Sequence, residues 1–129
     1  MTQGNGTLTI RLVHGTVSTD DILPARVKHQ TTDPALMAAH VFESYAPGLA
    51  ARLTDGSAII GDDVFGIGSS REQAVSALKA AGVRLIVAPA FGRIFYRNCW
   101  NLGLPAVEVN LVGADAADGD QLADAVRIV

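Results

Sequence analysis

The chain has 129 residues, a length at which we expect one domain and not a multidomain enzyme that carries a complete active site of its own. Hydrophobic residues make up 49% of the sequence and charged residues 18%, a composition that excludes a disordered chain. The formal net charge of −3 comes from 10 basic and 13 acidic side chains without a cluster of Lys or Arg, so we expect no nucleic-acid partner.

The first half of the sequence predicts one strand and one helix. Residues 8–13 alternate apolar and polar side chains, as a half-buried strand does. Residues 20–24 predict a turn or a short extended piece, because a proline restricts the residue before it to extended backbone. Asp33–Pro34 is typical of a helix start, and apolar residues at helical spacing predict that this helix runs to Tyr45 and ends before Pro47–Gly48.

The second half alternates strands and helices. Its expected elements are, in order, a strand at 57–60, a glycine-rich turn at 64–70, a helix at 71–81 ended by Gly82, a strand at 85–88, a helix at 91–102 and a strand at 105–109. Strand 85–88 is apolar throughout, as strands buried on both faces of a parallel sheet are. We therefore expect one α/β domain over residues 1–129, with a mostly parallel central sheet flanked by helices.

Cysteine and histidine usage limits the cofactors that this chain can hold. Cys99 is the only cysteine in the sequence, so we expect no internal disulfide, no zinc site built on paired cysteines and no iron–sulfur cluster. His14, His29 and His40 match no short metal-ligand spacing. A signal peptide pattern and an apolar run of about 20 residues are both missing, so we expect a soluble protein of the reducing cytoplasm.

The strongest candidate for chemistry is the stretch Phe65–Glu72, with the sequence FGIGSSRE, which connects a strand to a helix. Its two glycines permit close backbone approach, and the amide groups at a helix N-terminus favour an anion there. Arg71 can hold a carboxylate or a phosphate through two parallel hydrogen bonds. The alternative is a helix cap, in which Ser69 or Ser70 caps the helix and Glu72 completes a capping box.

A second candidate is the stretch 18–26, in which Asp20 and Asp21 stand next to a polar segment. These carboxylates could orient an arginine or a hydroxyl group. The alternative is an ordinary Asx turn. Spacing favours the turn.

Four stretches, in this order along the chain, resemble the small subunits of the isopropylmalate dehydratase group of the aconitase superfamily, equivalent to the swivel domain of single-chain aconitases. Residues 65–72 reproduce that family's pattern Phe-Gly-x-Gly-Ser-Ser-Arg-Glu. The other stretches are 19–26, 32–34 and 91–98, the last followed by Asn-Leu-Gly-Leu-Pro at 101–105. The resemblance favours a functional role for residues 65–72 over a helix cap.

The resemblance implies a two-subunit hydro-lyase that is active as a heterodimer or a higher heteromer. In this family a large subunit holds a [4Fe–4S] cluster on three cysteines, and one iron acts as a Lewis acid on the carboxylate and hydroxyl groups of the substrate. The small subunit is a β/β/α-type swivelling domain that closes over the substrate. The present chain is expected to bind no cofactor itself, in keeping with its single cysteine.

Residue by residue, the resemblance implies that Ser69 is the base that removes a proton from the carbon beside a carboxylate. Ser70 and Arg71 would bind substrate carboxylates. A serine can act as a base only as an alkoxide, which a helix N-terminus and Arg71 stabilise. The supporting residues that it implies are Asp20, Gly66 and Gly68.

In the same family the segment between Pro24 and Asp33 contacts the side chain of the substrate, which gives three further candidates for substrate binding, Arg26, Lys28 and His29. This segment is more polar than its family counterpart, which often carries a Tyr-Leu pair, and a polar segment suits a substrate with an additional polar group. We expect it to be a mobile loop until substrate and large subunit are bound.

Several substrates and two other function classes stay open. 3-Isopropylmalate, an intermediate of leucine biosynthesis, is the first expectation from the resemblance, and homoaconitate, a citrate-like acid or dimethylmalate are the alternatives. From other classes, the chain could be an anion-binding module that kept the glycine turn, or a purely structural subunit. The retained Ser-Ser-Arg sequence at 69–71 argues against the structural role.

Overall fold

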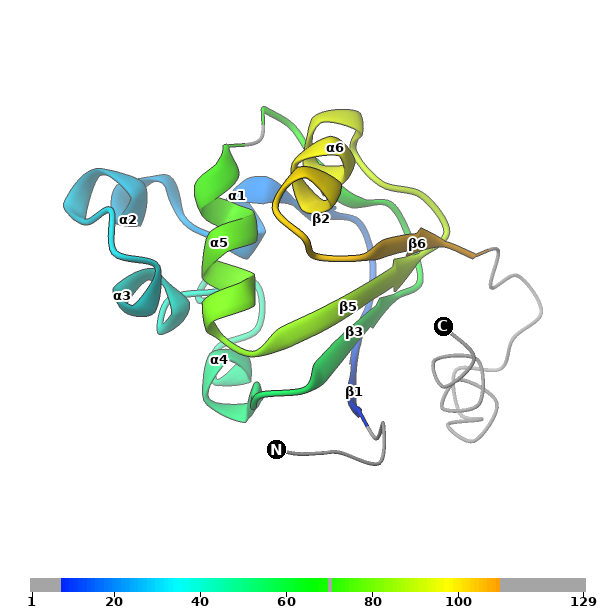
Figure 1. Cartoon of the computed structure of the whole chain (residues 1–129), viewed down its shortest axis with the longest axis horizontal. Coiled ribbons are helices and arrows are strands. Elements are labelled where there is room, and N and C mark those ends of the chain that lie inside the picture. Colours follow the sequence, from blue (N-terminus) through cyan, green and yellow to red (C-terminus); the bar gives the residue numbers. More distant parts are fainter. Residues whose placement is uncertain (1–7, 70, 110–129) are drawn as a thin grey trace.

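The computed structural model describes residues 8–69 and 71–109. A four-stranded parallel sheet lies at its centre, with β1 (Thr9–Val13), β3 (Ser57–Gly61), β5 (Val83–Ala88) and β6 (Ala106–Glu108) side by side in that order (Figure 1). Ile60 marks the register, since its partners are Leu12 on one side and Val87 on the other. The prediction of an α/β fold with a mostly parallel central sheet is confirmed.

A second, two-stranded parallel sheet pairs β2 (Val17–Ser18) with β4 (Phe65–Ile67). Residues 14–16 lead from β1 into β2, and residues 62–64 lead from β3 into β4. The chain therefore leaves the main sheet twice at the carboxyl ends of neighbouring strands and enters the small sheet in the same direction both times. This arrangement carries the glycine-rich stretch away from the main sheet.

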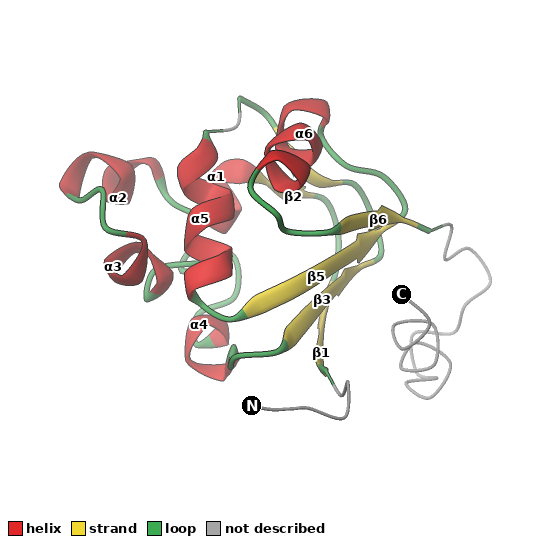
Figure 2. Cartoon of the chain, in the orientation of Figure 1, coloured by secondary structure: helices red, strands yellow, loops and turns green. Residues whose placement is uncertain are grey.

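The helices cover one face of the main sheet (Figure 2). They are α1 (Thr19–Ile22), α2 (Ala25–Gln30), α3 (Pro34–Ala38), α4 (Leu49–Arg52), α5 (Glu72–Ala80) and α6 (Arg93–Asn101). Helix α5 packs between α3 and α6. The main core lies beneath these helices and contains the fully buried Phe42, Phe65 and Phe95. Within the described part of the chain, the opposite face holds a smaller cluster to which no helix contributes.

Several predicted elements are confirmed closely. Asp33 accepts a hydrogen bond from the Ala35 amide at 3.0 Å and caps α3, with Pro34 in its first turn. The predicted strand at 57–60 is β3, and the predicted helix at 71–81 is α5. Gly82 follows that helix with φ of +103°, the left-handed conformation that glycine adopts at a helix end.

The predicted turn at 20–24 and the predicted loop at 26–31 are wrong in their local structure, because both segments contain short helices. Helix α1 begins after Ser18, whose hydroxyl accepts from the Asp21 amide while the Asp21 carboxylate accepts from the Ser18 amide. This reciprocal capping box stabilises a single helical turn. Helix α2 begins directly after Pro24 and buries Val27.

The predicted helix that ends at Tyr45 is too long, since α3 ends at Ala38. Phe42 has a φ of +59°, its amide donates to the Ile22 carbonyl at 2.8 Å, and its ring is fully buried against Phe65 and Tyr45. Burial of an aromatic ring contributes more free energy than helix propensity over a few residues. The packing of Phe42 therefore ends the helical pattern early.

Candidate active site

Strand β4, which leads into the glycine-rich turn, is held tightly against α6. Gly66 has a φ of +85°, and a β-carbon built there would lie 2.4 Å from the Phe95 ring. In the segment that leads into α6, the Ala90 carbonyl accepts from the Phe65 amide at 3.0 Å, and the Gly92 amide donates to the Phe65 carbonyl at 2.9 Å. The implied supporting role of Gly66 thus has a physical basis, because only glycine fits this position.

Beyond Gly66 the chain becomes exposed, so that Ile67, Gly68 and Ser69 face solvent. The Thr19 hydroxyl donates to the Ser69 carbonyl at 3.2 Å and ties this exposed turn to α1. Gly68 has a φ of +100°, a left-handed conformation in which a side chain would be strained. Ser69 is thereby presented on an exposed backbone that the Thr19 hydroxyl restrains.

Arg71 is the N-cap residue of α5, with extended backbone at φ −109° and ψ 155°, and its own side chain makes no capping hydrogen bond. The helix therefore begins after an exposed arginine, and its positive end faces the same side as the turn. The helix-cap alternative placed a serine at this position instead. Ser70 lies outside the described residues.

A solvent-open hollow of about 580 Å³ lies beside Arg71, between α5, α6, α3 and the segment before α3. Its lining consists of Thr32, Met37, Arg71, Glu72, Gln73, Ser76, Ile94 and Asn98. Half of these side chains are neutral and polar, namely Thr32, Gln73, Ser76 and Asn98, and the sequence analysis assigned none of these four a role in binding. The spacing of Ile94 and Asn98, one helical turn apart, is the signal that could have placed them on one face.

Of the remaining predicted site residues, two lie together and the other two lie apart from them. Asp20 and Lys28 lie together, with the Lys28 ammonium 3.8 Å from the Asp20 carboxylate and the Lys28 side chain only 8% exposed. Arg26 instead pairs with Glu43, which also contacts His40 at 2.9 Å. His29 is exposed on α2 and makes no side-chain hydrogen bond to any other residue that the structure describes.

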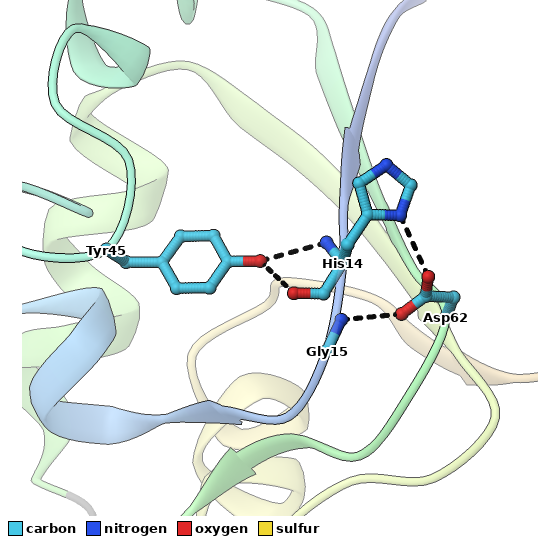
Figure 3. Close-up of polar contacts among 4 residues, drawn as sticks. All are labelled: His14, Gly15, Tyr45 and Asp62. Atoms are coloured by element: carbon cyan, nitrogen blue, oxygen red, sulfur yellow. Dashed lines mark hydrogen bonds and ion pairs between the residues drawn. The ribbon is translucent and has the colours of Figure 1, made fainter.

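The two turns that lead into the small sheet are joined by polar contacts around His14 (Figure 3). Asp62 accepts from the Gly15 amide at 2.7 Å and from the His14 ring at 2.8 Å. These hydrogen bonds, that of the His14 ring first, hold the pKa of the Asp62 carboxyl below its ordinary value. The Tyr45 hydroxyl accepts from the His14 amide at 2.9 Å and donates to the His14 carbonyl. These contacts connect the segment after β1 with the segment after β3, at the point where both leave the main sheet for the small sheet.

The chain's residues do not fit an iron–sulfur cluster. Cys99 is fully buried in the core, and its burial raises the pKa of the thiol to about 12, so it is a poor metal ligand. Among residues 8–69 and 71–109, no three His, Cys, Asp or Glu side chains lie close enough together to hold a metal ion. None of the helices in those two segments is long and apolar enough to cross a membrane.

Comparison with known protein families gives one match, the Aconitase C-terminal domain, over residues 17–110. This match covers β2 through β6 and every described candidate residue of the site. The chain belongs to the aconitase C-terminal domain family. The resemblance stated from residues 65–72 and the three other stretches is confirmed.

Comparison with individual proteins supports the same family membership. The chain is 47% identical over 105 residues to a protein named 3-isopropylmalate dehydratase small subunit from Metallosphaera sedula, and the alignment covers 81% of this chain and 64% of the relative. It is 46% identical over 112 residues to the protein of the same name from Moorella thermoacetica, and that alignment covers 87% of this chain and 64% of the relative. The chain thus spans about 64% of the length of these relatives.

The fold is similar to the crystal structure of 3-isopropylmalate dehydratase (LeuD) from Methanocaldococcus jannaschii. The TM-score is 0.76 at 36% sequence identity, and the match covers 83% of this chain and 64% of that one. The α/β fold that the sequence predicts is therefore that of a solved member of the family.

Proposed function

We propose that this chain is the small subunit of an iron–sulfur-dependent hydro-lyase that isomerises 3-isopropylmalate by dehydration and rehydration. The observation that carries the proposal is the exposed turn that presents Ser69 and Arg71 where α5 begins, in a chain that is 47% identical to a protein named for this activity. The pathway would be leucine biosynthesis in the cytoplasm, and the domain would extend over residues 1–129.

Ser69 is the proposed base. Its hydroxyl, as an alkoxide, takes the proton from the carbon beside a carboxylate, and the substrate loses its hydroxyl group from the neighbouring carbon. The positive end of α5 and the guanidinium of Arg71 favour the charged oxygen. Because Ser69 is exposed on a constrained backbone, it can reach a substrate held by a second subunit without a change of fold.

Arg71 and Ser70 are the proposed ligands of the substrate's carboxylates. A guanidinium holds a carboxylate through two parallel hydrogen bonds, which fixes both its position and its plane. Asp20 is a supporting residue, and Lys28 beside it keeps its ammonium group close to this carboxylate. Arg26, Lys28 and His29 stay predictions for contact with the substrate, which Arg26 would make only by leaving Glu43.

The partner is a large subunit, and we place the [4Fe–4S] cluster there, because the one cysteine of this chain is buried and protonated. That cluster would supply a Lewis acid for the leaving hydroxyl group. This chain supplies the base, the carboxylate ligands and one wall of the site. The assembly would be a heterodimer or a higher heteromer.

One observation favours a second substrate class. Four of the eight residues that line the hollow beside Arg71 are neutral and polar, among them Gln73 and Asn98, and the others are Arg71, Glu72, Met37 and Ile94. A substituent with an additional carboxyl group, as in homoaconitate or a citrate-like acid, would find more hydrogen-bond donors there than an isopropyl group needs.

The test is to produce this chain with the large dehydratase subunit of its own host under anaerobic conditions and to purify the pair through a tag on this chain. Iron and sulfide content are then measured, together with the dehydration of 3-isopropylmalate, citrate and dimethylmalate and the hydration of homoaconitate. Activity of the brown complex on 3-isopropylmalate supports the proposal. A colourless chain that binds the acids but recruits no large subunit would favour an anion-binding module instead.

A further inference from the structure

Thr19 is a buried polar residue, with 2% of its surface exposed. Only Ser57 shares this property among the described residues, and its hydroxyl bonds to the backbone of Thr54 within a local turn. The Thr19 hydroxyl instead reaches across fifty positions of sequence to the Ser69 carbonyl. A buried hydroxyl costs free energy unless it is hydrogen-bonded, so this long-range contact is the one that satisfies it.

The hydrogen bond from Thr19 to Ser69 lies at the least constrained part of the turn that follows β4. A β-carbon on Gly68 would meet nothing within 4 Å except the Thr19 hydroxyl oxygen, at 3.6 Å, whereas Gly66 is closely packed. The backbone therefore changes from tightly packed to open within two residues, and glycine leaves it free to rotate. The hydrogen bond from Thr19 restrains this open part at Ser69.

Thr19 is itself held rigidly. It follows Ser18, whose capping box with Asp21 fixes the start of α1. The Thr19 carbonyl accepts from the Leu23 amide at 2.9 Å. Ser18 is also the register partner of Ile67 in the small sheet, so the donor and the turn that it holds are aligned by backbone pairing.

We infer that Thr19 is a positioning residue, whose buried hydroxyl holds the backbone of Ser69 in the orientation that the reaction uses. This inference rests on the proposed role of Ser69 as a base. A misplaced reacting group slows the chemical step, whereas the carboxylate ligand Arg71 is held separately by α5. Loss of the hydroxyl should therefore lower kcat and leave KM almost unchanged.

The test compares Thr19→Val, which keeps the shape and removes the hydroxyl, with Thr19→Ser, which keeps the hydroxyl. In the complex with the large subunit, we expect T19V to lower kcat by about 10- to 100-fold with KM changed by less than about threefold. T19S should keep kcat within about threefold of the unmodified protein. Thr16→Val is the matched control, because it removes an exposed hydroxyl that bonds to Asp63 away from the turn.

A second measurement needs no catalysis. Hydrogen exchange of the peptide that spans residues 65–71, followed in the isolated chain, should be about tenfold faster in T19V and unchanged in T19S and T16V. A kcat within about twofold of the unmodified value in T19V, or equal losses in T19V and T19S, would overturn the inference. If the unmodified complex is inactive on every acid, the proposed function fails, and unchanged exchange in T19V would then overturn the positioning role separately.

Discussion

A β-carbon on Gly92 would lie 2.1 Å from the carbonyl oxygen of Gly66 and 2.7 Å from its carbonyl carbon. The start of α6 thus rests directly on the backbone of β4, just before the exposed turn that carries Ser69. The neighbouring hydrogen bond from the Gly92 amide to the Phe65 carbonyl keeps the two segments in this contact. Two glycines far apart in the sequence therefore form a single packing unit.

This contact predicts that Gly92→Ala is strongly destabilising. The new methyl group must displace backbone on both segments, and we expect the free energy of unfolding to fall by about 3 kcal/mol in urea titrations. Gly61→Ala is the control, because a β-carbon there meets Phe65, Val13 and Ala88 only at 3.5–3.7 Å and needs no left-handed backbone. It should change the unfolding free energy by less than about 1 kcal/mol. Equal effects in the two variants would contradict the packing argument.

Ser69→Ala should remove the proposed base without disturbing the fold, because Ser69 is exposed and its described hydrogen bond uses the backbone carbonyl. We expect kcat of the complex to fall by about 1,000-fold or more, with assembly on the large subunit unchanged. Ser44→Ala, another exposed serine, is the control for activity. Near-normal turnover of the Ser69 variant would remove this residue from the mechanism.

Arg71→Lys should weaken substrate binding although the charge is kept. Lysine offers a point charge and loses the paired geometry of the guanidinium, so we expect KM to rise by about 10- to 100-fold. Steady-state kinetics of the complex with 3-isopropylmalate checks this. Arg97→Lys, an exposed change on α6, should leave KM unaltered. A KM for the Arg71 variant equal to that of the control would show that no carboxylate is held there.

The contact of His14 with Asp62 predicts a dependence of stability on pH in the acid range. Because folding lowers the pKa of the Asp62 carboxyl, the ionised group stabilises the fold above the ordinary carboxyl pKa of about 4, and this contribution is lost as pH falls through the lowered value. Asp62→Asn should therefore flatten the fall of Tm below about pH 5. Glu108→Gln, at an exposed carboxylate on β6, is the control and should keep the full fall. If Tm of the Asp62 variant falls with decreasing pH as steeply as that of the unmodified protein, Asp62 is not the source of this dependence.

The sequence predicts the main sheet well because its strands carry a strong local signal. Strand β5 is almost wholly apolar, and its nearly complete burial matches that pattern. The alternation in β1 is typical of a strand, although Leu12 is exposed and Arg11 is partly buried. The start of α3 at Asp33 and the end of α5 at Gly82 are also local chemistry. These elements need no knowledge of the rest of the chain.

The errors arise where distant contacts decide the backbone. Phe42 leaves the helical pattern to fill the core and to donate to the Ile22 carbonyl, and neither partner is apparent from spacing. Distant contacts also decide the backbone of the candidate site. The stretch 65–72 is recognisable as a motif, but the role of Thr19 depends on the pairing of β2 with β4, which no local pattern indicates.

In the stretch from Phe65 to Arg71, the residues that hold the backbone in place are not the residues that face the proposed substrate side. Phe65 and Gly66 are buried and fix the backbone, whereas Ile67, Ser69 and Arg71 face solvent and contribute little to the core. The exposed positions can therefore change identity at small cost in stability. A library restricted to these exposed positions should consist largely of folded proteins, so that a loss of activity among its members would report on the chemistry of the site and not on the fold.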